Sequence, residues 1–214
     1  MTAPRLFVGA CAALVVAACG IGKPAPHTAT YVLDPPQPTR TSTTRHPQAL
    51  RMGNVRVAPA FASPPLVYRT GEVQYTPDFY NAFIAEPGPL LGASMAEWLD
   101  RAGPFKTVSQ PGGYVNAPYA LEAVVTELYG DFRPGRKPAA VMTVQFTLVD
   151  VTGPSPTVVM ERFIGRRIDL PEASPDALVR GYSVALGQIL EELSTQIAPA
   201  ANGWLGPSVS SQPT

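Results

Sequence analysis

The chain has 214 residues, of which 45% are hydrophobic and only 15% charged, and its 16 basic side chains balance 16 acidic ones. This neutral balance lacks the basic stripe typical of nucleic-acid binding, and the apolar fraction is too high for a wholly disordered chain. The length fits one domain with tails. Proline is the unusual residue, at 25 of 214 positions, well above its average share of about 5%.

Residues 1–18 have the features of a secretory signal. Arg5 supplies a positive charge, and an apolar run over 6–16 follows. This run suits a signal peptide and is too short for the ~20 residues of a membrane-spanning helix. Small residues directly before Cys19 resemble the lipobox of bacterial lipoproteins, in which the cysteine is diacylated, the peptide is cut before it and the new amine is acylated.

Lipidation at Cys19 implies a location as well as an anchor. Gly20 follows the cysteine, whereas an aspartate there is the usual signal for retention in the inner membrane. The resemblance therefore implies the periplasmic face of the outer membrane, with acyl and diacylglycerol lipid as the only attached group. Two alternatives stay open: an ordinary signal peptide cleaved after Ala18, and a buried helix with an incidental cysteine.

The sequence offers few groups for catalysis or metal binding. Both cysteines lie within the first 19 residues, so the processed chain cannot form an internal disulfide. The two histidines, His27 and His46, lie in a stretch rich in proline and threonine, which makes a histidine-dependent or zinc site improbable. The chain has neither a Gly-x-Ser-x-Gly motif nor a phosphate-binding Gly-x-x-x-x-Gly-Lys loop. We therefore expect no enzyme, no cofactor and no metal.

The composition divides the chain into four parts. After the signal peptide, the proline-rich residues 19–48 are expected to form a lipidated tether, with a first strand at 30–34. One domain is expected over 49–198. Residues 199–214, rich in alanine, glycine, proline and serine, are expected to be disordered.

The sequence of the first half of the domain predicts a strand, a hairpin and two helices. Alternating residues predict a strand over 52–58, and Thr70-Gly71 indicates a hairpin. A short helix is predicted over 78–84, with Asp78 as its N-cap. A second helix is predicted over 91–102, because its apolar residues recur at helical spacing and Gly-Pro follows.

The second half predicts a meander and a long helix. Strands over 119–129, 140–148 and 158–168 are separated by short turns, which favours antiparallel pairing. Ser174-Pro175 opens the last helix. Its apolar stripe comprises Leu178, Tyr182, Leu186, Ile189, Leu190, Leu193 and Ile197. This order predicts an α+β fold with a mainly antiparallel sheet, helices packed on one face and an N-terminal lipid tether.

Several segments, in a fixed order, resemble a known family. They are Pro65–Arg69, Tyr75–Phe83 and Trp98–Phe105, preceded by Tyr31–Pro35 after the tether. Together they resemble the ABC-type transport auxiliary lipoproteins, which accompany the mammalian cell entry (MCE) lipid transporters, including the paraquat-inducible system. The resemblance extends over about residues 31–197.

The resemblance implies a non-catalytic accessory of an MCE-type ABC transporter of phospholipid. Its expected partners are the MCE-domain protein, the membrane through the lipid anchor, and another copy of the chain, but not nucleic acid. Two other functions stay open. One is an envelope lipoprotein that regulates a cell-wall synthesis enzyme, and the other is a lipid-binding carrier, which needs an apolar pocket of several hundred Å³.

Phe79 and Tyr80 are the main candidates for a partner contact. They are adjacent, and one face of a helix cannot bury both rings. At least one ring is therefore expected to be exposed, and exposed aromatic residues are favoured anchors at interfaces. Tyr68 or Arg69 from the neighbouring hairpin is expected to join this surface, which contacts the MCE protein or a second copy of the chain.

Other prominent residues have structural explanations. Phe83 and Trp98 are expected in the core. The basic turn over 133–137 is expected to be a solvated hairpin tip, with contact to lipid head groups or an acidic partner as the functional alternative. The arginines of the strand over 158–168 are expected to be edge charges that oppose aggregation.

Overall fold

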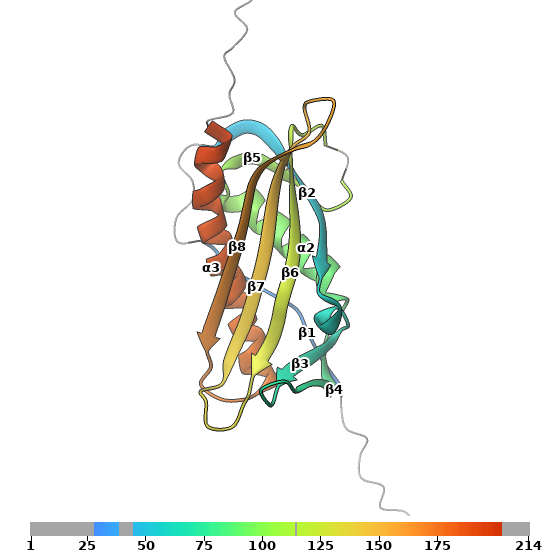
Figure 1. Ribbon diagram of the computed structural model, residues 1–214, viewed down its shortest axis with the longest axis vertical. Coiled ribbons are helices and arrows are strands. Elements are labelled where there is room, and N and C mark those ends of the chain that lie inside the picture. The colour runs from blue at the N-terminus through green and yellow to red at the C-terminus, as the bar shows by residue number, and fades with distance from the viewer. Residues whose placement is uncertain (1–27, 39–44, 114, 203–214) are drawn as a thin grey trace, which may run out of the picture.

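In the computed structural model, which describes residues 28–38, 45–113 and 115–202, eight strands form one sheet and two long helices cover one of its faces (Figure 1). Cys19, the signal peptide and the expected C-terminal tail lie outside the described residues. In chain order the elements are β1 (Ala29–Tyr31), β2 (His46–Val57), the 3-10 helix η2 (Pro59–Phe61), β3 (Pro65–Arg69), β4 (Tyr75–Phe83), α2 (Pro87–Ala102), β5 (Phe105–Ser109), β6 (Tyr119–Asp131), β7 (Ala139–Asp150), β8 (Thr157–Asp169) and α3 (Pro175–Asn202).

β6 is the central strand, because three other strands pair with it. β7 lies antiparallel along one edge, and β8 continues this meander as predicted. Two strands share the other edge and both run parallel to β6: β2 reaches Val57 opposite Val125, and β3 places Tyr68 opposite Gly130. The expected α+β fold with a mostly antiparallel sheet is thus confirmed. The sheet is nevertheless mixed, because crossover connections allow some strands to pair in parallel.

The helix predicted over 78–84 is wrong, because this segment belongs to β4. β4 pairs antiparallel with β3 and parallel with β1. The register with β3 shifts along the strand: Val67 lies opposite Pro77, whereas Pro65 lies opposite Ala82. The extra residues of β4 form a bulge, which we call the Phe79–Tyr80 bulge (residues 78–81).

Asp78 explains why the local sequence resembled a helix start. Its Oδ1 accepts hydrogen bonds from the backbone N–H groups of Tyr80, at 2.7 Å, and Asn81, at 3.1 Å. These are the bonds that an N-cap side chain makes in a helix. In this protein the same bonds close a turn within a strand, because the chain beyond it is paired on both sides.

The predicted helices are otherwise confirmed, with small differences at their ends. α2 begins at Pro87, a few residues before the predicted start, and ends as predicted where Gly103 N–H donates to the Leu99 carbonyl at 2.8 Å. Ser174 Oγ accepts a hydrogen bond from Ala177 N–H at 3.3 Å and so caps α3. The short strand β5 was not predicted.

The core lies between the sheet and the helix layer. Every residue of the predicted α3 stripe is at most 1% exposed. The inward side chains of β7 facing α3 are all fully buried; they are Met142, Val144, Phe146 and Leu148. Phe83 and Trp98 are buried as expected, at 4% and 3% exposure. α3 packs on β7 and β8, and α2 packs on β2 and β5.

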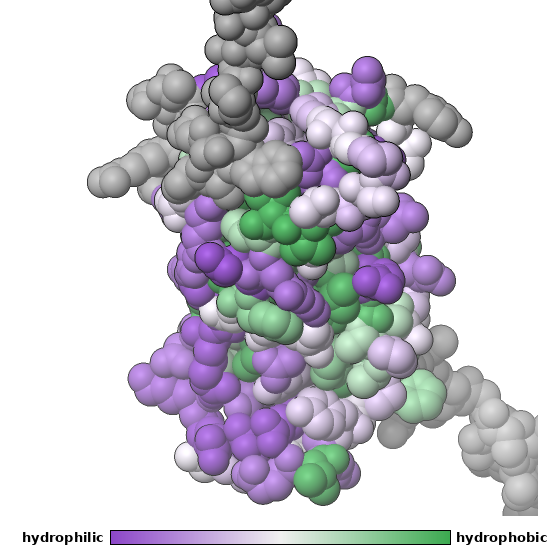
Figure 2. Space-filling model, turned by 45° about the horizontal axis from the view of Figure 1, so that its top comes forward, coloured by the Kyte–Doolittle hydropathy of each residue, from purple (hydrophilic) through white to green (hydrophobic). Residues whose placement is uncertain are grey.

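The helices leave the other face of the sheet open. Figure 2 shows a surface on which hydrophobic residues are interspersed with hydrophilic ones. At one end of this face the rings of Phe61, Tyr75 and Tyr129 contact one another, with centroids 5.3–6.0 Å apart. This small aromatic cluster attaches η2 and the start of β4 to β6.

A buried ion cluster lies near these rings. The fully buried Asp131 accepts hydrogen bonds from Arg133 Nε and Nη2, both at 2.8 Å, and from Arg167 Nη1 at 2.7 Å. These bonds, chiefly those from Arg133, hold the pKa of Asp131 well below its usual range. Arg133 also donates to Glu72 at 3.0 Å. The expected basic turn is thus partly an internal brace between β6, β8 and the β3–β4 hairpin.

Truncation of α3 at its centre should destabilise the fold. We expect Leu186→Ala to lower the free energy of unfolding by about 2–5 kcal/mol, because it leaves a cavity under a fully buried side chain. Denaturant unfolding measures the change. Val184→Ala is the matched control, since Val184 lies on the same helix but is 37% exposed. A loss below about 1 kcal/mol for Leu186→Ala would show that α3 does not close the core.

Asp131→Asn should weaken the fold in a pH-dependent way. We expect a loss of about 3 kcal/mol at neutral pH, because two guanidinium groups lose their buried partner. The folded-state pKa is depressed, so this contribution is complete above the unfolded value of about 4 and declines as the pH falls below it. The free energies of unfolding of the unaltered protein and of Asp131→Asn should therefore become more similar as the pH falls. Asp169→Asn is the control, because the Asp169 side chain is 60% exposed. A loss of stability in Asp131→Asn that is the same at every pH would contradict the ionised state assigned to Asp131.

Candidate functional site

The Phe79–Tyr80 bulge presents two aromatic rings to solvent. Phe79 is 90% exposed and Tyr80 49% exposed, and their ring centroids are 6.5 Å apart. The expectation that at least one ring would be exposed is confirmed, although its reason was wrong. The rings diverge from a strand bulge and not from a helix.

Asp78 holds the bulge in one conformation. In addition to the two backbone bonds, its Oδ2 accepts hydrogen bonds from the Tyr68 hydroxyl and from Asn81 Nδ2, the latter at 2.9 Å. Burial acts to raise the pKa of Asp78, whereas these hydrogen bonds act to lower it. The combined effect of the hydrogen bonds is the larger, so the pKa lies below its usual value. Burial and the bond to Asp78 raise the pKa of Tyr68. Asp78 is therefore ionised and rigidly bonded at neutral pH.

Tyr68 and Arg69 support this surface and are not projected from it. The Tyr68 ring stacks on Phe132, with centroids 4.9 Å apart. Arg69 donates through Nη2 to the Glu72 carbonyl at 2.6 Å and lies 5.8 Å from the centroid of the Tyr75 ring. Of the four residues predicted for partner contact, only Phe79 and Tyr80 are presented outward. Their contact with another protein stays a prediction.

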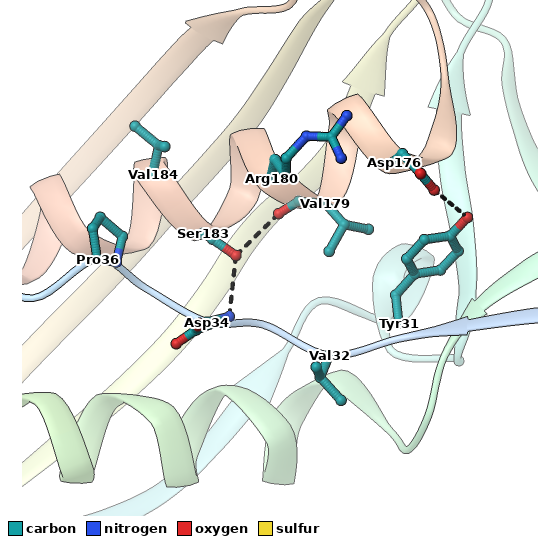
Figure 3. A pocket seen from close by; sticks show the side chains of 9 residues that line it. All are labelled: Tyr31, Val32, Asp34, Pro36, Asp176, Val179, Arg180, Ser183 and Val184. Atoms are coloured by element: carbon teal, nitrogen blue, oxygen red, sulfur yellow. Dashed lines mark hydrogen bonds between the residues drawn. The ribbon is translucent and has the colours of Figure 1, made fainter.

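Part of the segment expected as tether packs on the domain. We call residues 32–36 the strap; they run between α2 and α3 (Figure 3). Asp34 N–H donates to Ser183 Oγ at 3.1 Å, and Trp98 Nε1 donates to the Pro36 carbonyl at 3.0 Å. Leu33 is only 7% exposed. The strand expected at 30–34 is present as β1, but it ends at Tyr31. Sequence reasoning missed the packing of the residues after it, because proline-rich composition indicates a linker.

An open groove of about 530 Å³ lies between the strap and α3 (Figure 3). The Tyr31 hydroxyl lies at its end, 2.9 Å from a carboxylate oxygen of Asp176 and 3.0 Å from the amide oxygen of Asn81. Val32 and Val184 give the groove apolar sides. Its rim is polar, with Asp34 and Arg180 both exposed.

The groove does not have the geometry of a hydrolytic site. Ser183 Oγ donates to the Val179 carbonyl at 3.1 Å and accepts from Asp34 N–H, so its hydroxyl is occupied by the backbone. His46, the histidine that the structure describes, is buried, with Nε2 3.2 Å from the Ala198 carbonyl. Within the described part of the chain, no three histidine, cysteine or acidic side chains form a metal-binding group. None of the helices described there is long and apolar enough to cross a membrane.

Solved structures of the same fold come from proteins of low sequence identity. A Xanthomonas campestris protein, XCC0632, of the family DUF330, superposes with a TM-score of 0.71 and 15% identity, covering 82% of this chain and 98% of that one. An uncharacterized protein superposes with a TM-score of 0.59 and 19% identity, covering 82% and 99%. At these identities the similarity shows the fold alone. No match is found among curated proteins.

The sequence itself matches one family model. This model describes the ABC-type transport auxiliary lipoprotein component and matches residues 31–198, which include strands β2 to β8, the last residue of β1, all of α2 and most of α3. The match includes the strap, the Phe79–Tyr80 bulge and the core stripe of α3. It confirms the resemblance found in the sequence, and the chain belongs to the family of ABC-type transport auxiliary lipoproteins.

Proposed function

We propose that this lipoprotein is a non-catalytic accessory of an MCE-type ABC transport system for phospholipid, held on the periplasmic face of the outer membrane by lipid on Cys19. The family match over residues 31–198 carries the proposal. The domain docks the periplasmic MCE protein, alone or as an assembly of several copies, while the lipid keeps it at the membrane. No chemical step is assigned to the domain.

The path of the chain suits a mechanical role. The tether enters through β1, which pairs with β4, and continues as the strap between the two helices. The strap is fixed to α3 through Ser183 and to α2 through Trp98. A load on the tether therefore reaches both helices and the sheet. This attachment supports a domain that bridges a membrane and a partner.

The alternative of a lipid carrier receives less support. A carrier encloses most of an acyl chain in an apolar pocket. The groove beside the strap is open, and the charged residues Asp34 and Arg180 lie at its rim. The interior between sheet and helices is filled by the side chains of the core cluster.

Capture experiments separate the accessory role from regulation of a cell-wall enzyme. We expect the purified lipidated chain to retain the periplasmic domain of an MCE protein and not a peptidoglycan synthase. The control is a fusion of residues 1–28 to an unrelated domain, which carries the same lipid without the α+β domain. Retention of the synthase in place of the MCE protein would favour the regulator, and equal retention by the fusion would show that lipid or detergent causes the capture.

Cys19→Ser should abolish lipidation. Because the thiol accepts the diacylglycerol, we expect the variant to accumulate as unprocessed precursor held in the inner membrane by its apolar N-terminal segment. Incorporation of labelled fatty acid and membrane fractionation measure the effect. Cys11→Ser is the matched control, since this cysteine lies inside the apolar run and should leave processing unchanged. Normal labelling and outer-membrane fractionation of Cys19→Ser would contradict the anchor.

A further inference from the structure

We propose that the Phe79–Tyr80 bulge is a second membrane contact, whose rings enter the interface of the bilayer that also holds the lipid anchor. The inference rests on the lipid anchoring in the proposed function. It assigns a lipid surface, and not a protein, to the aromatic residues that project from β4.

The exposure of this hairpin needs an explanation. The two most exposed large apolar side chains among the described residues are Val73, at 93%, and Phe79, at 90%, and both belong to the β3–β4 hairpin. Asp78 bonds to the backbone of the bulge and so holds the part of the chain that presents the two rings. Amphipathic aromatic rings are favoured at the boundary between membrane and water.

The bulge lies where the chain arrives from the lipid anchor. β1 pairs with β4 in parallel, with Ala29 opposite Asn81, so the described chain starts at Thr28 beside the bulge (Figure 1). Thr28 lies nine positions after Cys19 in the chain, and nine residue steps span at most about 30 Å. The end of the domain that carries the bulge is thus held close to the bilayer.

The opposite end of the domain is farther away than the tether can reach. α3 has 28 residues and is therefore about 42 Å long. It begins at the same end of the molecule as the β3–β4 hairpin and ends at the other (Figure 1). When the long axis of the domain stands upright on the membrane, only the hairpin end can touch the surface.

The contact should be apolar and not electrostatic. The cations at this end already have carboxylate neighbours: Arg133 pairs with Asp131, Arg136 lies 3.9 Å from Glu72, and Lys137 lies 3.8 Å from Asp169. These opposite charges offset one another, so the end has little net charge to attract anionic lipid. Insertion should occur in neutral vesicles and persist at high salt, where exposed charge interactions are screened.

Tryptophan fluorescence in vesicles tests the proposal. The full lipidated chain is reconstituted in phosphatidylcholine vesicles brominated near the head-group end of the acyl chains. We expect Phe79→Trp to lose most of its added emission and to shift to shorter wavelength, at low and high salt alike. Phe163→Trp is the matched control, because this ring is 64% exposed but lies on the open sheet face opposite Gln145; its emission should stay unquenched.

Each result decides between lipid and the alternatives. Unquenched emission from Phe79→Trp in chains that float with the vesicles overturns the contact while the anchor stands. Quenching of both variants shows unspecific adsorption and also overturns it. If the emission of Phe79→Trp shifts only when the MCE protein is added, and shifts without brominated lipid, the bulge contacts a protein partner. Chains that do not float refute the anchor and the contact together. Tyr80→Trp repeats the test if Phe79→Trp unfolds at a lower temperature.

Discussion

The sharing of one edge of β6 between two strands decides the arrangement of the whole domain. β6 has 13 residues, and β2 pairs with its first part only. The remaining end is free to pair with β3, so the β3–β4 hairpin is brought to the end of the sheet. β1 then adds to β4, which places the entry of the tether beside the hairpin. The exposed aromatic rings and the tether are neighbours for this reason.

Two kinds of interaction hold that end of the sheet together. On the open face, the rings of Phe61, Tyr75 and Tyr129 contact one another and so connect η2, β4 and β6. Beside them, Arg133 bonds to both Asp131 and Glu72. The contact between the rings involves no charged group, whereas the ion cluster requires an ionised aspartate. The hairpin therefore has a support that is stable under neutral conditions.

The strap gives the tether a mechanical role that its composition conceals. Prolines lack a backbone donor and disfavour regular pairing, yet here the Pro36 carbonyl accepts the indole N–H of the buried Trp98. Gly187 makes room for this segment, since a Cβ there would lie 3.1 Å from the Pro36 ring. The end of the tether is thus part of the folded domain, which shortens the free chain between membrane and sheet.

Regular periodicity determined much of this protein from the sequence. The alternation in 140–148 and the apolar stripe of α3 identify their elements and buried faces, because a long periodic pattern satisfies one packing arrangement only. The family was also recognisable, since its motifs are local. The exposure of an aromatic residue in the pair 79–80 followed from adjacency, whatever the element.

Long-range pairing decided the rest. Asp78 makes the same two backbone bonds in a helix cap as in a strand bulge, so local sequence cannot distinguish them; the pairing of β4 with β1 and β3 does. The parallel partners of β6 are likewise set by crossovers that leave no local pattern. Only the tertiary structure therefore showed that Tyr68 and Arg69 are supports, that the strap is packed, and that the exposed rings lie beside the tether, because each depends on contacts between segments far apart in the chain.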